Sequence, residues 1–177
     1  MDPVTVSTHI SKPRDEVFAY LADIANHPEF CDHFLTDWHL TREESYGQGA
    51  GARFRMKRRF DRFAFGDWTF SHVEAPWKIV ARGRSGKFNR IRMLTIWEVQ
   101  PSGHGTDVTL TFEWESAMLS DKLAQIGYRG WAKRRWGKAL RRLRAIHETG
   151  RERGQRATIS GGARKPATPL TSGPAGA

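Results

Sequence analysis

The feature that most constrains the fold is a series of six strand-like segments with no room for a crossover helix between them. They are residues 37–44, 52–59, 65–74, 78–84, 89–100 and 106–114, and turn-forming stretches such as YGQGAG, EAPW and PSGHG separate them. Parallel neighbours would need a connection of about a dozen residues or more. The segments are therefore predicted to pair as an antiparallel sheet.

Alternation along two of these segments indicates that one face of the sheet is covered. In VTLTFEW, every second residue from Val108 to Trp114 is apolar, and the residues between them are polar. In RFRMK, Phe54 and Met56 alternate with basic residues. We expect the apolar face to pack against another layer and the polar face to contact water.

Helical segments precede and follow these strands. After a β-branched stretch at residues 3–10, ISKPRDEVFAYLADIANHPEF offers Ser11 as an N-cap, and Pro28 is expected to begin a second short helix. From Ser120 to Gly150 the spacing predicts one long helix, about 45 Å in length. Its apolar stripe is predicted to cover the sheet and consists of Leu123, Ile126, Gly130 or Trp131, Leu140, Leu143 and Ile146.

Positive charge is concentrated in the C-terminal third of the chain. Residues 1–128 contain 16 Lys and Arg against 17 Asp and Glu, whereas residues 129–177 contain 13 against 2. From Gly150 onward, Gly and Pro supply 9 of 28 residues and no aromatic residue occurs. Such a composition predicts a folded domain at residues 1–149 and a disordered basic tail at residues 150–177, which we expect to be dispensable for stability.

The sequence favours a cytoplasmic protein. It has no apolar run of 18 residues, and MDPVTVSTHI lacks the basic and apolar regions of a secretory signal. The single cysteine, Cys31, cannot form an intramolecular disulfide.

The order of strand, two short helices, six strands and long helix is that of the helix-grip fold. The chain resembles the START-related, pollen-allergen-like superfamily (SRPBCC), in its polyketide cyclase/dehydrase and lipid transport branch. The stretches that carry the resemblance are ISKPRDEVFAYLADIANHPEF, TDVTLTFEWE and KALRRLRAIHE, and with the strand order they cover residues 2–149. The resemblance implies an α+β fold in which a curved antiparallel sheet of about seven strands and the long helix enclose a cavity for a hydrophobic small molecule.

The predicted cavity lining combines the apolar strand face with the start of the long helix. It consists of Phe54, Met56, Trp68, Phe70, His72, Ile91, Met93, Trp97, Leu110, Phe112, Trp114, Ile126, Gly127, Gly130 and Trp131. The two glycines are included because their missing side chains leave room beneath the helix; close packing or a bend is the alternative reason. The alternative for the aromatic residues is that they simply fill the core.

Catalysis in such a cavity would require inward titratable groups, and the candidates are His72, Arg90, Arg92, Glu98 and Glu115. Of these, His72 shares a strand face with Trp68 and Phe70, although a solvent-exposed histidine at a strand end is the commoner case. No Ser-His-Asp or Cys-His arrangement is recognisable, and the catalytic residues stay unassigned. Binding of a lipid or polyketide-like molecule is therefore favoured over a cyclase/aromatase-type enzyme, which the resemblance also allows.

Two further patterns have simpler interpretations. In HPEFCDH, the residues His27, Cys31 and His33 have metal-like spacing, but no second His/Cys pair accompanies them. We therefore expect neither a metal nor a cofactor, and surface histidines on a short helix are the favoured interpretation. RGWAKRRWGKALRRLR interleaves Trp131 and Trp136 with cations. For this segment we favour a solvated helix face. Weak contact with an anionic membrane surface is the second interpretation, and binding of nucleic acid, for which no motif is present, is the third.

Overall fold

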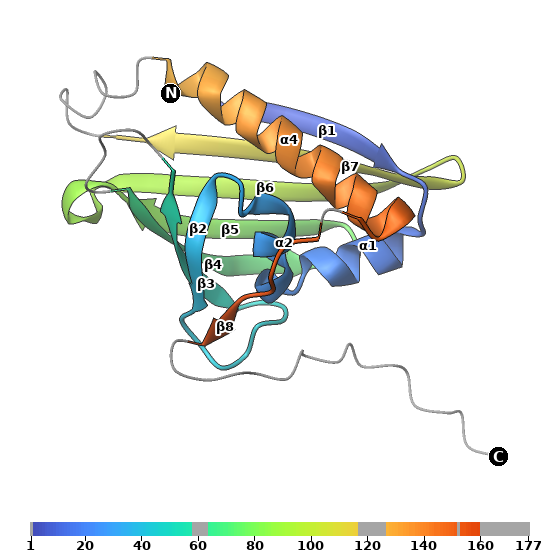
Figure 1. The fold of residues 1–177 in the computed structure, drawn as a ribbon, viewed down its shortest axis with the longest axis horizontal. Helices are drawn as coiled ribbons and strands as arrows, with labels where there is room; N and C mark the ends of the chain where they lie inside the picture. Colours follow the sequence, from blue (N-terminus) through green and yellow to red (C-terminus); the bar gives the residue numbers. More distant parts are fainter. Residues whose placement is uncertain (1, 58–63, 117–126, 152, 160–177) are drawn as a thin grey trace.

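The computed structural model describes residues 2–57, 64–116, 127–151 and 153–159. They form a curved, mostly antiparallel sheet, with the long helix α4 (Tyr128–Thr149) lying across one face and the short helices at one end (Figure 1). This is the helix-grip arrangement that the sequence predicts. No helix in these ranges is both long enough and apolar enough to cross a membrane.

The N-terminal part supplies one strand and the short helices. It consists of β1 (Val4–Ile10), α1 (Arg14–Leu21), the 3₁₀ turn η1 (Ile24–Asn26) and α2 (His27–Cys31). Helix α1 follows Pro13, and the predicted N-cap Ser11 has a different role, since its amide donates to a carboxylate oxygen of Glu148 at 2.9 Å. The start of the chain is thereby connected to the end of α4.

Eight strands form one sheet in the order β1-β7-β6-β5-β4-β3-β2-β8. After β1 come β2 (Leu35–Leu40), β3 (Gly51–Met56), β4 (Phe65–Glu74), β5 (Lys78–Ser85), β6 (Ile91–Ser102), β7 (Gly105–Glu115) and β8 (Thr158–Ile159), and the 3₁₀ turn η2 (Lys87–Asn89) joins β5 to β6. All neighbours pair antiparallel except β2 and β8. The six predicted strands are therefore confirmed, and β8 is an addition.

Helix α4 packs mainly against β1 and α2 through one apolar face. The buried residues of this face are Tyr128, Ala132, Trp136, Ala139, Leu140, Leu143 and Ile146. The helix ends at Gly150, which has a φ of +67° and donates its amide to the carbonyl of Ile146 at 3.1 Å. The predicted start of the helix at Ser120, with Leu123 and Ile126, lies outside the described residues.

The expectation of disorder from residue 150 is wrong for residues 153–159. Strand β8 pairs with β2, and the amides of Gly154 and Ala157 donate to backbone carbonyls of the α2 and η1 region, at 2.9 and 2.8 Å. Arg156 pairs with the buried carboxylate of Asp23, and Arg153 lies 3.2 Å from a carboxylate oxygen of Glu29. These contacts attach the first part of the tail to the domain, because its cations neutralise carboxylates that the fold buries.

Candidate functional site

The predicted strand residues of the lining share the covered face of the sheet. Each is at most 7% exposed, and they are Phe54, Met56, Trp68, Phe70, Ile91, Met93, Trp97, Leu110, Phe112 and Trp114. They share one face because side chains alternate along each strand. This placement agrees with the prediction, while their role in binding remains a proposal.

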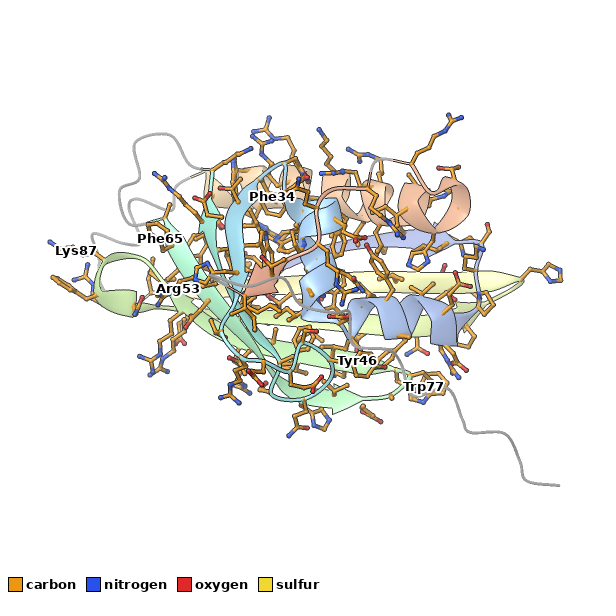
Figure 2. All side chains as sticks on the ribbon, turned by 60° about the horizontal axis from the view of Figure 1, so that its bottom comes forward. Phe34, Tyr46, Arg53, Phe65, Trp77 and Lys87 are labelled. Carbon is orange, nitrogen blue, oxygen red and sulfur yellow. The ribbon has the colours of Figure 1, made fainter. Side chains whose placement is uncertain are left out.

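Trp136, from the middle of α4, is the residue around which the other rings of this interior are arranged. Its ring stacks on that of Trp68 at 5.7 Å between centroids. It also contacts the rings of Phe34 at 5.0 Å, Phe112 at 5.9 Å and Trp97 at 6.0 Å. Phe34 is labelled in Figure 2, close to the helix.

Trp136 is absent from the predicted lining because it stands among cations in the sequence. The signal that identifies it is its distance of four and seven positions from Leu140 and Leu143, which is typical of one helix face. Its position indicates that much of the space between sheet and helix is occupied by aromatic side chains. Among the described residues, the aromatic side chains at the centre of the domain therefore fill the core, which is the simpler of the two interpretations of the aromatic content.

The two helix glycines do not lie beneath the helix. Gly127 has a φ of +80° and precedes the first turn of α4, so its role is to provide a left-handed backbone conformation. Gly130 is exposed, and a Cβ atom there would meet nothing within 4 Å apart from its chain neighbours and the backbone of its own helix. The prediction that Gly130 leaves ligand space is therefore wrong, whereas Trp131 is half-buried and contacts the rings of Phe34 and Tyr128.

The expected inward orientation of His72 is also wrong. The register of β4 against β5 shifts between Phe70 and His72, which indicates a β-bulge, and His72 is exposed. A bulge inserts one residue into a strand and so interrupts the alternation of faces. The sequence gives no sign of this insertion.

His27 occupies the interior instead. Its side chain is fully buried among the rings of Phe30, Phe70 and Trp97, with centroids 5.3 to 5.6 Å away. Its Nε2 atom donates to the carbonyl of Leu21 at 2.9 Å, and burial lowers the pKa of the imidazole to about 4. The neutral ring therefore presents Nδ1 as an acceptor that has no partner among the described residues.

We expect the free energy of unfolding to decrease as the pH falls from about 6.5 to about 4. The folded pKa of His27 lies below its ordinary value, so the unfolded chain binds this proton first and acid favours unfolding. The loss in the free energy of unfolding is roughly 2–3 kcal/mol for a pKa shift of this size.

Urea denaturation across this pH range should show a shallower dependence of the free energy of unfolding on pH for His27→Gln, which retains a donor for the carbonyl of Leu21. The residual slope comes from His33, whose pKa burial lowers to about 4, and from His147, whose pKa burial also lowers. An identical slope in wild type and variant would contradict this assignment.

Three more polar atoms of the buried face lack a partner among the described residues. They are Nε1 of Trp68, Oγ of Ser85 and Oγ1 of Thr95. Thr95 lies between Met93 and Trp97 on β6, and its β5 neighbour is Ala81. Alternation alone places Thr95 inside, so the sequence contains the signal for this residue.

The other candidates for chemistry do not converge in the interior. Arg92 pairs with Glu115 at 3.9 Å, and Glu98 lies 3.7 Å from Lys78, all on the polar face of the sheet. Arg90 is half-buried next to the ring of Phe88, outside the aromatic interior.

The HPEFCDH segment does not form a metal site. The buried side chain of His27 faces aromatic rings, and His33 bonds the carbonyl of Arg135. Burial raises the pKa of the Cys31 thiol, which disfavours the thiolate. In the described ranges no group of three or more His, Cys, Asp or Glu side chains could hold a metal ion.

A curved antiparallel sheet, crossed by a long C-terminal helix over an aromatic interior, defines a helix-grip protein of the START-related, pollen-allergen-like superfamily. Over residues 1–148 the chain matches the family described as polyketide cyclase/dehydrase and lipid transport, and it belongs to that family. No curated protein sequence matches the chain.

Solved structures share this fold at low sequence identity. TTHA0849 from Thermus thermophilus is 16% identical, with a TM-score of 0.64 over 85% of this chain and 99% of its own. Ginseng major latex-like protein 151 from Panax ginseng is 14% identical, with a TM-score of 0.61 over 83% of this chain and 97% of its own. DynU16, a protein in the dynemicin biosynthetic locus, is 21% identical, with a TM-score of 0.59 over 87% of this chain. This chain spans 50% of the length of DynU16.

Proposed function

We propose that the protein binds a hydrophobic small molecule, lipid or polyketide-like, between the covered face of the sheet and α4. The observation that carries this proposal is a set of four buried polar atoms without partners in the described part of the chain, on His27, Trp68, Ser85 and Thr95, within an otherwise apolar interior. Apolar surface with a few polar groups is the usual composition of a small-molecule site. Membership of the polyketide cyclase/dehydrase and lipid transport family supports the same class of ligand.

The polar atoms favour a ligand that carries hydroxyl or carbonyl groups. A buried donor or acceptor without a partner costs about 1–3 kcal/mol, so a ligand that provides the missing partner recovers this free energy. Because Trp136 contacts rings on several sides, the ligand would displace some of these ring contacts as it enters. The proposed site is therefore one that opens during binding.

Binding is favoured over catalysis by the properties of His27. General bases work best with a pKa near the operating pH, and a pKa of about 4 makes this imidazole a weak base at neutral pH. A cyclase-type enzyme that shapes a reactive polyketide in the same interior is the alternative function. Incubation with a bound polyketide would distinguish the two, since an enzyme changes the structure of the compound and a carrier releases it unchanged.

Thr95→Val tests the proposed site, because it removes the hydroxyl and nearly preserves side-chain volume. The probes are 2-naphthol and 2-methylnaphthalene, which differ in their ability to form a hydrogen bond. Wild type should bind 2-naphthol more tightly than 2-methylnaphthalene. In the variant, the ratio of the two affinities should fall about fivefold, which corresponds to the free energy of roughly one hydrogen bond. Since an unpartnered hydroxyl is removed, the variant should be at least as stable as wild type.

Thr109→Val is the matched control, because it is the same substitution at a position on the polar face of β7, outside the proposed site. It should leave the preference for 2-naphthol unchanged. Isothermal titration and native mass spectrometry of the purified protein provide the measurements. The proposal is wrong if neither probe binds at millimolar concentration and no hydrophobic compound copurifies.

A further inference from the structure

The outer face of α4 carries a concentration of positive charge that the proposed interior site does not use. Between Tyr128 and Thr149 the helix has eight Lys and Arg residues and one acidic residue, Glu148. Three of the eight are paired, because Arg129 contacts Asp2, Arg142 contacts Asp32 and Arg144 contacts Glu148. The other five form what we call the cationic face, namely Lys133, Arg134, Arg135, Lys138 and Arg141.

No ion pair joins the cationic face to a carboxylate in the described part of the chain. Lys138 has Arg134 and Arg135 one turn before it and Arg141 one turn after it. Like charges at this spacing on a helix repel and destabilise it. An anionic partner that covers this face would remove the repulsion.

The cationic face lines a groove and has an aromatic residue at its border. Its five residues line a shallow surface groove of about 480 Å³ together with Gly137 and Trp131. Five cations within nine consecutive helical residues extend over about 12 Å. Trp131 is half-buried, with its ring against those of Phe34 and Tyr128, so an apolar edge adjoins the charged surface.

We propose that this face docks the protein on the surface of an anionic lipid bilayer, with α4 parallel to the membrane plane. Amphipathic helices that lie on membranes combine Lys and Arg with a bordering tryptophan in this way. Each basic residue near an anionic surface strengthens binding by about fivefold. The five residues of the cationic face are sufficient for salt-sensitive association.

A bilayer fits this face better than a nucleic acid does. From Tyr128 to Glu148 the helix has no Asn, Gln, Ser or Thr side chain, so only its Lys and Arg residues could contact a base edge, and the same residues bind the phosphates of a lipid surface. The ring of Trp131 lies against Tyr128 at 4.9 Å, and the guanidinium of Arg135 lies over it at 6.0 Å, so its faces do not offer a free platform for stacking bases. The feature that favours a bilayer is therefore the apolar edge at Trp131 beside the five cations.

The experiment is sedimentation of the full chain with vesicles of phosphatidylcholine, either pure or containing 30% phosphatidylserine. We expect binding to the anionic vesicles at 0.1 M NaCl, little binding to the neutral ones, and loss of binding at 0.5 M NaCl because salt screens exposed charges. The triple variant Arg134→Glu, Lys138→Glu, Arg141→Glu should bind at least about 100-fold more weakly, since three favourable charges are lost and three repulsive ones are introduced. All three residues are exposed, so the variant should fold as wild type does in circular dichroism.

The matched control is Arg53→Glu, Arg82→Glu, Arg84→Glu. These three residues are exposed on the polar face of the sheet, and the change in net charge is the same. The control should retain vesicle binding within about twofold if location, rather than total charge, determines binding. Equal loss in the two triple variants would overturn the proposal, as would a wild-type protein that ignores anionic vesicles or binds only a duplex DNA oligonucleotide in the same buffer.

Discussion

Replacing Trp136 by alanine should lower the free energy of unfolding by about 3–5 kcal/mol, the range found for large-to-small changes in a core. The ring is 2% exposed and contacts four other aromatic rings, so its removal opens a space that the surrounding rings cannot fill by small movements. Urea denaturation monitored by circular dichroism would measure the change.

Trp131→Ala is the matched control for this change, because it is the same substitution on the same helix at a half-buried position. It should cost clearly less than the change at Trp136. Apolar cavities of this kind bind small aromatic molecules, so indole should raise the melting temperature of Trp136→Ala and leave wild type nearly unaffected. A midpoint for Trp136→Ala equal to that of Trp131→Ala would show that Trp136 is not the centre of the packing.

Truncation of the chain after Gly150 should lower the free energy of unfolding by roughly 3–5 kcal/mol, as expected when a buried carboxylate loses its partner. The deletion removes Arg156 and Arg153, which pair with Asp23 and Glu29. It also removes β8 from the edge of β2.

A second truncation, after Ile159, is the control because it retains every described contact of the tail. It should melt within a degree or two of the full chain. If the two truncated proteins had the same melting temperature, the contacts of residues 153–159 would contribute nothing, and the tail would be dispensable, as its composition suggests.

The strands could be predicted from the sequence because their signal is local. Alternation in VTLTFEW places Phe112 and Trp114 on the covered face without knowledge of the partner strands, and both are buried. The long helix could be predicted for the same reason, through the spacing of Leu140, Leu143 and Ile146.

The features that could not be predicted depend on contacts between distant parts of the chain. His72 points outward because β4 has an extra residue relative to β5, which becomes visible only when the strands are paired. His27 is buried because α2 lies against Phe70 and Trp97, from two different strands. The tail composition averages over 28 residues and conceals the short RATI stretch, in which Arg156 meets Asp23 and β8 completes one edge of the sheet.

The position of β1 has a consequence for how the protein forms during synthesis. Among the strands that the structure describes, β1 pairs only with β7, and 106 positions separate the bonded side chains of Thr5 and Thr111. At a translation rate of about 5–20 residues per second, the first strand waits roughly 5–20 s before its partner is synthesised. Pairing over so long a separation is entropically costly and slow. The nascent chain therefore exposes an unpaired strand for seconds, and because α4 is synthesised after β7, neither of the two elements that contact β1 most in the folded protein is available to protect it from aggregation during this interval.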